Sequence, residues 1–374
     1  MNVKGVGMTK FGAQANTSQE LVYEAALEAL DDADASMDDI DAIVVSVIDT
    51  ESNGERQRLF ANVLSSILKK KVPILTATAV CGGGGAALWT ANKLDYSNVL
   101  VVGVERLLTN NSMKITDEIM MAAERIYEQA EGLNFPAQNA LVAQQYMLKY
   151  GATMDDLALV AFKNHQNAYL NPKARFYNKE VTLRQIKNSP VVASPLRLFD
   201  CSLSVNGAAA VVLTKDKTDV EIAGSGLFVD RLSAFESQDM TSWEATKLAA
   251  AEAYKQAGIA PEDVDIAEVH DAFTSVELIS YEDLGFCRKG DAKELIRKGT
   301  TSLNGKLPVN TSGGLKAKGH PISATGISQV YEVVKQMRKQ ADKRQIDNVE
   351  YGLAQNIGGA GSTVTVHILR KVSL

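Results

Sequence analysis

The sequence predicts an α/β protein whose two halves are copies of one unit. The stretch EALDDADASMDDIDAIVVS from Glu28 aligns without a gap with EAYKQAGIAPEDVDIAEVH from Glu252, 224 residues further along the chain. Each stretch is an alanine-rich amphipathic helix, a short acidic connection and a strand-like apolar run. Helices and strands that alternate over short loops are typical of α/β domains with a largely buried sheet.

A second pair of segments supports the duplication. Cys81 opens CGGGGAALWTA, which leads through a predicted helix to YSNVLVVGVE, and in the second half GHPISATGISQVYEVV leads in the same way to IDNVEYGLAQNIGG. Each of the two segments is a glycine-bearing turn, a helix and then a strand. Two copies are too few, and their period is too long, for a solenoid. We therefore predict two halves, residues 1–216 and 217–374.

The segment from about residue 112 to residue 194 departs from this pattern. It is helix-like, polar and rich in Asn, Gln and Lys, and the apolar strand of residues 208–213 then returns to the first sheet. Long insertions in compact domains are usually functional. We expect this one to lie over one face as a lid or binding loop.

Composition excludes several classes of protein. The 374 residues are 45% hydrophobic and 22% charged, with a formal net charge of −6, whereas a nucleic-acid-binding protein would carry a basic surface. No apolar run approaches the roughly 20 residues that span a bilayer, and the N-terminus lacks the apolar core of a signal peptide. Three scattered cysteines favour neither a disulfide framework nor a metal site. We expect a protein of the reducing cytoplasm without nucleic-acid or membrane partners.

Cys81 is the first candidate for chemistry. The thiolate is the reactive form of cysteine, and a helix start lowers a thiol pKa because its unpaired N–H groups favour negative charge. The four glycines that follow would let a ligand approach the backbone closely. The pattern fits an acyl-accepting nucleophile and a buried cysteine packed among glycines equally well. A nucleotide-binding loop is disfavoured because no Gly-Lys-Ser/Thr follows.

Two of the four histidines stand where active sites form. His320 lies between a glycine and a proline, in a turn that the repeat pairs with the Cys81 turn, so the two turns are expected to face each other. His270 ends a strand-like run, and sites in α/β sheets gather at such strand ends. Asp271 is expected to fix a turn or cap a helix. A cysteine beside an imidazole is the minimal activated thiol nucleophile.

The remaining candidates lie near the C-terminus and in the insertion. Asn356 and Gly358 belong to AQNIGGAGSTVTVHIL, whose glycine turn offers backbone N–H groups for an oxyanion hole. His367 alternates with apolar residues, so we expect it to be structural. His165 lies in the insertion, where we expect it to cap or pack.

With these residues in place, the chain resembles the thiolase superfamily nearly from end to end. KGVGMTKFG, Cys81, NGAAAVVL, VHDAF, PVNTSGGLKAKGHPISATG and NIGGAGSTVTVHIL follow in the family's order and spacing, and GGxxxxGHPxxATG is highly specific. The VHDAF variant, the N-terminal motif and the short length are similar to the archaeal and sterol-carrier-type acetyl-CoA acetyltransferase branch. The resemblance implies a five-layered α-β-α-β-α fold made of two similar halves.

The resemblance also implies a mechanism, ping-pong acyl transfer between coenzyme A thioesters. Cys81 would take an acetyl group and His320 would activate the thiol. His320, with a water held by His270, would also stabilise the enolate of the second thioester. The N–H groups of Cys81 and Gly358 would stabilise the tetrahedral acyl intermediate.

The family's pattern assigns further contacts and partners. Ser323, Phe273 and Gly314 would contact the coenzyme A thioester, and neither a tightly bound cofactor nor a metal ion is expected. Homodimers or homotetramers are usual in the family. In archaea such enzymes feed mevalonate synthesis, and the resemblance suggests a complex with hydroxymethylglutaryl-CoA synthase and a small zinc-ribbon/OB-fold protein.

The chain departs from the family's pattern at the second cysteine, the base that removes the α-proton in most thiolases. Asn356 stands where that base is expected, and Ala272 stands where sterol-carrier-type enzymes carry theirs. Asn206 replaces a usual aspartate. Because an amide does not titrate, Asn356 cannot act as a general base, which leaves His270 and His320 as candidates.

Three functions therefore stay open. The first is an acetyl-CoA acetyltransferase that interconverts two acetyl-CoA with acetoacetyl-CoA and CoA. The second is a partner-dependent acyltransferase or retro-Claisen lyase that acts on a larger acyl-CoA. The third is a non-catalytic subunit that binds acyl-CoA or scaffolds a partner. The joint presence of Cys81, His270 and His320 argues against the third.

Overall fold

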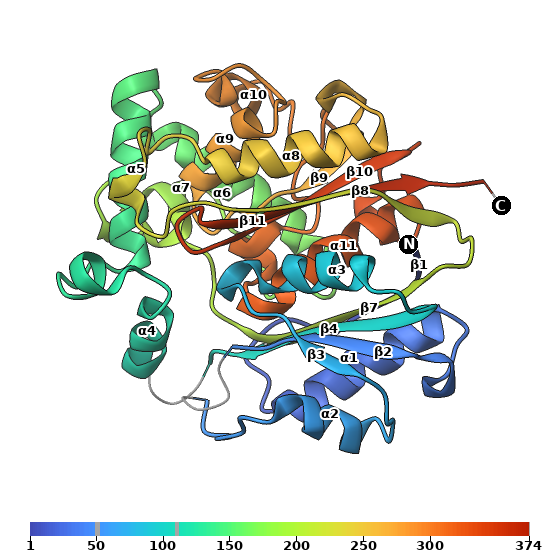
Figure 1. Ribbon diagram of the computed structural model, residues 1–374. Helices are drawn as coiled ribbons and strands as arrows, with labels where there is room; N and C mark the ends of the chain where they lie inside the picture. The colour runs from blue at the N-terminus through green and yellow to red at the C-terminus, as the bar shows by residue number, and fades with distance from the viewer. Residues whose placement is uncertain (49–52, 109–111, 374) are drawn as a thin grey trace.

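The computed structural model describes residues 1–48, 53–108 and 112–373. Figure 1 shows five stacked layers in the order helix, sheet, helix, sheet, helix, which is the fold that the sequence predicts. The helices of these layers are α1 (Ser18–Asp32) and α2 (Phe60–Ile67) on one outside, α3 (Gly83–Lys93) and α11 (Thr325–Met337) in the centre, and α8 (Glu244–Ala257) with α9 (Thr274–Asp283) on the other side.

The first sheet has the strand order β3-β2-β4-β7-β1. Its strands are β1 (Asn2–Met8), β2 (Ala42–Ser46), β3 (Ile74–Thr76), β4 (Asn98–Arg106) and β7 (Asn206–Thr214). β2 pairs in parallel with β4, whereas β4 and β7, and β7 and β1, are antiparallel. Helices cover both faces, which explains why these strands are near-continuous apolar runs.

The second sheet has four strands in the order β8-β11-β10-β9, which repeats the β1-β7-β4-β2 part of the first sheet. β3 has no counterpart among the described strands. The strands of the second sheet are β8 (Val220–Val229), β9 (Ile266–Glu268), β10 (Tyr351–Gly358) and β11 (Thr363–Lys371). β9 pairs in parallel with β10, and the other pairs are antiparallel. The two halves therefore share one fold, as the aligned segments predict. A short ladder, in which Asn2 and Val3 face Glu221 and Val220, joins the two sheets.

The chain crosses from the first sheet to the second between β7 and β8, in residues 215–219. The predicted division at residues 216 and 217 falls in this link. That each half is a separate domain stays a prediction.

The two central helices touch backbone to backbone, which explains several glycines of the Cys81 motif. A Cβ on Gly84 would lie 2.9 Å from the backbone nitrogen of Gly326, and a Cβ on Gly326 would lie 2.2 Å from that of Gly85. Such contacts leave no room for a side chain on either helix. The glycine run is therefore a packing surface that sets the distance between the two halves.

The insertion is helical, and it packs on the second half. It contains α4 (Ser112–Met120), α5 (Phe135–Tyr150), α6 (Met154–Tyr169) and α7 (Leu183–Lys187), followed by a hairpin of β5 (Val191–Ala193) and β6 (Leu196–Arg197). Asn134 caps α5 by accepting from the N–H of Ala137, and Gly151 ends it at a φ of +69°. Val142, Tyr146 and Val160 join a core cluster with α8 and α9.

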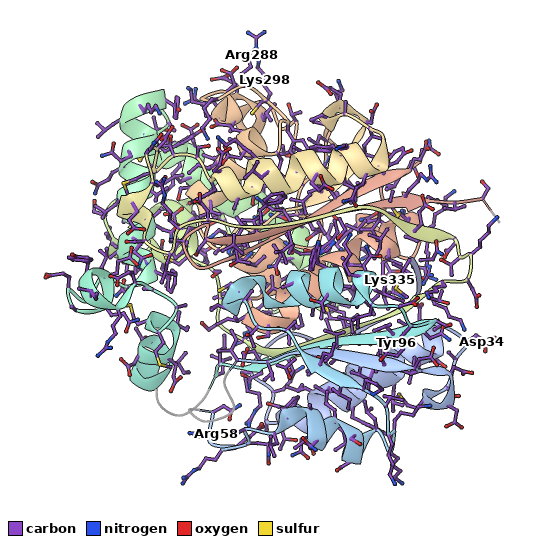
Figure 2. All side chains as sticks on the ribbon, in the orientation of Figure 1. Asp34, Arg58, Tyr96, Arg288, Lys298 and Lys335 are labelled. Carbon is purple, nitrogen blue, oxygen red and sulfur yellow. The ribbon has the colours of Figure 1, made fainter. Side chains whose placement is uncertain are left out.

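Side chains fill the space between the layers, and charged groups point outward at both ends of the stack. Arg288 and Lys298, which flank α10 (Ala292–Arg297), project at one end, and Arg58 projects beside α2 at the other (Figure 2). In the described part of the chain, no helix combines the length and the apolar character needed to cross a membrane.

Candidate active site

A cavity of about 320 Å³ opens where the two halves and the insertion meet. Its wall carries three side chains from distant parts of the sequence: Cys81, His270 and His320. The rest of the wall is mainly apolar and comes from the insertion and the second half. It includes Met120, Phe135, Val142, Trp243, Val276 and Ile357. The volume and the apolar wall with a few polar groups are typical of small-molecule sites, which measure roughly 300–1,000 Å³.

Cys81 lies in the 3-10 turn η2 (Val80–Gly82), directly before α3. Val80, the residue before it, has a φ of +48°, which is unusual for a β-branched residue. Strained backbone of this kind clusters at functional sites, where surrounding packing holds it in place. Here Gly358 packs against the turn, since a Cβ on Gly358 would lie 2.2 Å from the carbonyl oxygen of Ala79. The thiol is thus presented to the cavity by a tightly held turn.

The environment of Cys81 differs from the sequence expectation. Burial, followed by the nearby carboxylate of Glu105, raises the pKa of the Cys81 thiol to about 12. The helix start was expected to lower this pKa, but desolvation outweighs it because both the thiol and Glu105 are enclosed by the two sheets. Cys81 is therefore a thiol at neutral pH. It needs a neighbouring base to become a nucleophile.

His320 has the geometry of such a base. Its Nδ1 lies 2.7 Å from the hydroxyl of Thr325 at the start of α11, and its buried Nε2 has no hydrogen-bond partner among the described residues. Burial lowers the pKa of His320 to about 3, so the ring is neutral at physiological pH. A threonine hydroxyl both donates and accepts, so Thr325 supports either tautomer of the ring. Nε2 can accordingly accept a proton or donate one into the cavity.

His270 is held in a single tautomer. The side-chain amide of Asn356 donates to its Nδ1 across 3.3 Å, so the proton of the neutral ring sits on Nε2. Burial, with a smaller effect of His320, moves the pKa of His270 well below its usual value. The two imidazole rings stand edge to face, with centroids 5.4 Å apart. His270 is therefore a hydrogen-bond donor beside a histidine that can change roles.

Asn356 connects three parts of the site, because both the oxygen and the nitrogen of its side-chain amide are hydrogen-bonded. Its Oδ1 accepts from the N–H of Gly85 at 3.0 Å, and its Nδ2 donates to the carbonyl of Cys81 at 2.9 Å. These two bonds fix the orientation of the amide, because a flipped amide would set oxygen against oxygen and N–H against N–H. The predicted active-site residue Asn356 thus holds the Cys81 turn, α3 and His270 together.

The structure places the three residues expected to contact the thioester in different settings. Phe273 lies on the cavity wall. Ser323 does not reach the wall: it is fully buried, and its hydroxyl donates to Glu105 at 2.6 Å. Gly314 is also buried, in the π-helical turn η7 (Gly314–Lys318), where a Cβ would lie 2.2 Å from the Asp271 carboxylate. In this structure buried carboxylates therefore lie beside Ser323 and Gly314, and contact of these two residues with a thioester stays a prediction.

Asp271, as expected, fixes a turn. Its carboxylate accepts from the N–H groups of Leu315 at 2.6 Å and Lys316 at 3.2 Å. Burial and the nearby Glu277 raise the pKa of Asp271 to about 7. The bonds connect the His270 segment to the loop that carries His320.

The other two histidines are structural in this fold. His367 lies within 3.0 Å of the Ser225 hydroxyl and 3.1 Å of the Gly85 carbonyl, so it braces the start of α3 from β11. His165 is buried in α6 with its ring edge-on to Phe176 and Phe199. Both placements fit the roles that their sequence patterns predict.

Sequence reasoning missed one segment of the site, residues 201–204. Ser202 donates its N–H to the carbonyl of Ala272 at 2.8 Å, and the N–H of His320 donates to Leu203 at 2.8 Å. Cys201 also pairs with Phe273 and Ser204 pairs with His320, so the segment lies between the His270 segment and the loop that carries His320. Cys201 reaches the cavity wall. Its only sequence signal is a cysteine just before the glycine and alanine run of β7.

No set of three or more His, Cys, Asp or Glu side chains suited to a metal ion occurs within residues 1–48, 53–108 and 112–373. The cavity wall instead carries two thiols and two imidazoles, which suit the transfer of an acyl group and of protons.

Comparisons with known proteins give the family. The thiolase N-terminal domain matches residues 2–195, and the thiolase C-terminal domain-like family matches residues 226–371. The acetyl-CoA acetyltransferase of Methanothermobacter thermautotrophicus is 38% identical over 99% of this chain and 99% of that protein. A benzoylsuccinyl-CoA thiolase subunit of Thauera aromatica is 34% identical over 96% of this chain and 94% of that protein.

Among solved structures, the Ltp2–ChsH2(DUF35) aldolase is similar with a TM-score of 0.83 and 26% identity, over 99% of this chain and 97% of that one. The matched domains cover most of the sequence, and their order agrees with the two halves of the fold. The chain belongs to the thiolase family.

Proposed function

We propose that this chain is an acetyl-CoA C-acetyltransferase that interconverts two acetyl-CoA with acetoacetyl-CoA and CoA. The observation that carries the proposal is the convergence of Cys81, His270 and His320 on one cavity, with the Nε2 of His320 unpartnered. The acetyl-CoA acetyltransferase of Methanothermobacter thermautotrophicus, similar over nearly its whole length, supports acetyl as the transferred group.

In the first half-reaction, the neutral imidazole of His320 takes the proton of the Cys81 thiol through Nε2. The thiolate attacks the thioester carbonyl, and the proton passes to the departing CoA thiolate. Because the pKa of Cys81 is raised to about 12, the thiolate forms only as the base removes its proton. Positioned acid–base catalysis of this kind contributes about 10²- to 10⁴-fold to a rate.

In the second half-reaction, a second acetyl-CoA becomes an enolate that attacks the acetylated Cys81. The Nε2–H of His270, whose tautomer Asn356 fixes, is suited to donate to the enolate oxygen, directly or through a water. Backbone N–H groups at the Cys81 turn and at Gly358, which packs on that turn, are candidates for the oxyanion hole of the acyl intermediate.

Self-association and a partner chain belong to the same proposal. β3 ends the first sheet and leaves Leu75 44% exposed, and Leu59, at the start of α2, which packs against β3, is 67% exposed. An open edge strand with apolar side chains is suited to pairing with a second copy. Leu75→Lys should therefore shift a homodimer or homotetramer toward monomers in size-exclusion chromatography with light scattering, whereas an unchanged mass would contradict an interface at this edge.

The solved neighbour named Ltp2–ChsH2(DUF35) aldolase supports association with a small partner chain. The expected complex with hydroxymethylglutaryl-CoA synthase and a small zinc-ribbon/OB-fold protein, a role in mevalonate synthesis and a cytoplasmic location rest on the resemblance to archaeal enzymes. Copurification with a zinc-containing chain from the native host would support the complex.

The decisive experiment is the intact mass of the protein after incubation with acetoacetyl-CoA, followed by peptide mapping and addition of free CoA. We expect an acetyl adduct on Cys81 that CoA removes. Cys81→Ala should form no adduct, whereas the matched control Cys287→Ala should form it normally. A wild-type chain that binds CoA yet forms no adduct would contradict acetyl transfer and favour the binding or scaffold subunit.

A second candidate function, transfer or cleavage of a bulkier acyl group, is favoured by the apolar wall of the cavity. Phe135 and Val142 of the insertion, with Trp243, extend this wall well beyond the size of an acetyl group. The similar chain of Thauera aromatica is named a benzoylsuccinyl-CoA thiolase subunit. Thiolysis rates for 3-oxoacyl-CoA substrates of increasing length and for an aromatic one distinguish the two functions, since a maximum at acetoacetyl-CoA would exclude the bulkier substrate.

A further inference from the structure

The proposed reaction needs a group that removes the α-proton of the second thioester. Ala272 carries no titratable group, and the amide of Asn356 does not titrate and is fully used by Gly85, Cys81 and His270. His270 presents an N–H rather than a lone pair to the cavity. Of the two imidazoles, this leaves His320, whose Nε2 is free once Cys81 is acetylated. His320 either takes the α-proton itself or activates a second group on the same wall that takes it.

Cys201 stands at the required place. It follows the 3-10 turn η4 (Leu198–Asp200), lines the same cavity as Cys81 and is paired with Phe273, next to Ala272. Two residues further, Leu203 accepts the N–H of His320 at 2.8 Å. The segment is thus bonded both to the stretch after His270 and to His320 itself. Cys201 pairs with the residue that follows Ala272, the position where a cysteine would follow His-Asp.

The surroundings of Cys201 suit proton transfer. Its Sγ lies 3.6 Å from the carbonyl oxygen of Arg197, which accepts the thiol proton and orients the group. Burial, together with the nearby Asp200, raises the pKa of Cys201, and the charge of Lys316 offsets only part of this rise. Cys201 is therefore a thiol that needs a base, as Cys81 is. The Lys316 side chain is 1% exposed, and its Nζ has no hydrogen-bond partner among the described residues. Once a base has removed the Cys201 proton, a positive charge nearby stabilises the thiolate, which is the form that accepts the α-proton.

A second observation marks this wall as a place for a ligand. His320 lines the cavity and is 7% exposed, yet its buried Nε2 has no hydrogen-bond partner among the described residues. Buried polar atoms are nearly always hydrogen-bonded in folded proteins, so an orphan on a cavity wall points to a bound molecule that completes it. Cys201 and this nitrogen belong to the same wall, and a thioester held there would meet both.

We propose that Cys201 is a second acid–base residue of the reaction and takes the α-proton of the thioester that attacks acetylated Cys81. The inference rests on the proposed function. The two positions where the resemblance expects this base, Ala272 and Asn356, lie in the second half of the chain, whereas Cys201 lies in the first half.

The neutral imidazole of His320, free once Cys81 is acetylated, first takes the proton of the Cys201 thiol through Nε2. The Cys201 thiolate then forms an S–H bond as the Cα–H bond of acetyl-CoA breaks, and the electron pair of that bond becomes the enolate. The enolate carbon forms a C–C bond with the acetyl carbonyl on Cys81, and the bond from that carbonyl to Sγ breaks. Cys81 leaves as a thiolate and takes the proton from the His320 imidazolium, while Cys201 keeps the α-proton as a thiol. The three residues return to their starting states, and acetoacetyl-CoA is released.

The test separates the two half-reactions in the variants Cys201→Ala and Cys201→Ser. Acetylation of Cys81 is followed by intact mass, and enolate formation by deuterium uptake into the methyl group of acetyl-CoA in D₂O. We expect Cys81 acetylation within about threefold of wild type, and deuterium uptake and condensation reduced by about 100-fold or more, the lower range for loss of a proton-transfer group. Cys287→Ala, which removes a half-buried thiol outside this wall, is the matched control and should match wild type in both assays.

The serine variant distinguishes catalysis from packing. Serine keeps the size and the hydrogen bond to Arg197 but does not titrate in the working range, so it should fail as alanine does. If serine restores deuterium uptake, or if alanine slows both half-reactions equally, Cys201 acts through packing and the inference is overturned. Unchanged uptake in alanine also overturns it. A wild-type chain without an acetyl adduct contradicts the proposed function itself, which is a different result.

Discussion

The ring of His320 stands edge-on to the ring of His270, with an interplanar angle of 88° and centroids 5.4 Å apart. The two rings differ in the partner at Nδ1, which is a threonine hydroxyl for His320 and an asparagine amide for His270. The hydroxyl both donates and accepts, whereas the amide N–H only donates. One imidazole can therefore exchange protons, and the other is fixed as a donor.

The bond between His320 and Thr325 gives the first prediction. In Thr325→Val the Nδ1 of His320 loses the hydroxyl that can both donate and accept, so Nδ1 has no matching partner as Nε2 gains and loses the Cys81 proton. We expect kcat for thiolysis to fall by about 10- to 100-fold, part of the acid–base contribution, with little change in KM. Steady-state kinetics of acetoacetyl-CoA thiolysis measure this.

Thr325→Ser keeps the hydroxyl and is the control. It should stay close to wild type in the same assay. Equal rates for the valine and serine variants would show that the hydroxyl does not support the base.

The amide of Asn356 gives the second prediction. In Asn356→Asp, a carboxylate oxygen would face the Cys81 carbonyl and the lone pair of His270 Nδ1, where an N–H now donates. His270 would have to move its proton to Nδ1, and Nε2 would lose the hydrogen offered to the enolate. We expect condensation to fall by at least about 100-fold, as for loss of one oxyanion donor.

Acetylation of Cys81, followed by intact mass, should suffer less in this variant than condensation does. A condensation rate within about twofold of wild type would contradict the assigned tautomer, since that tautomer depends on the amide donor.

The close contact of α3 and α11 gives the third prediction. In Gly326→Ala the new Cβ would lie 2.2 Å from the backbone nitrogen of Gly85, and neither helix can move without shifting a sheet. We expect the free energy of unfolding to drop by about 3 kcal/mol or more, as for severe overpacking. Urea denaturation followed by circular dichroism measures the change.

Gly12→Ala is the comparison for this substitution. A Cβ there has Arg175 Cδ at 3.6 Å, an ordinary contact. If both variants lose a similar free energy of unfolding, the loss comes from replacing any glycine, and the contact between α3 and α11 is not its cause.

The buried ring of His367 gives the fourth prediction, a pH dependence of stability. Burial lowers the pKa of His367 to about 4 in the folded protein, below its usual value near 6.5. Between these values the unfolded chain binds a proton that the folded chain does not, so stability is lost as the pH falls. The loss is about 1 kcal/mol between pH 6.5 and pH 5.5 for this one residue.

His367→Gln should remove this contribution to the pH slope, whatever its effect on absolute stability. Urea unfolding of both proteins at pH 7.0, 6.5 and 5.5 gives the slopes. Parallel slopes for wild type and variant would contradict a depressed pKa at this residue.

Sequence patterns alone determined the duplicated fold and the principal side chains of the site. The period of the apolar residues and the glycine turns are local signals, and the gap-free alignment of the two halves paired the Cys81 turn with the His320 turn. Those signals were enough to predict a duplicated α/β fold in which the Cys81 turn faces the His320 turn. The five layers and the role of His270 beside them came from the resemblance of the motifs to the thiolase superfamily.

Only the tertiary structure decided the pKa values at the site and the hydrogen bonds that hold its residues in place. Asn356 bonds to Cys81 across 275 residues of sequence, and Ser323 bonds to Glu105 across 218. The pKa of Cys81 rises rather than falls because burial and the nearby carboxylate of Glu105, on another element, act on it. Cys201 reaches the cavity wall in a segment that pairs with Phe273. Burial and charge at a site are sums over neighbours from the whole chain, so a local pattern carries no record of them.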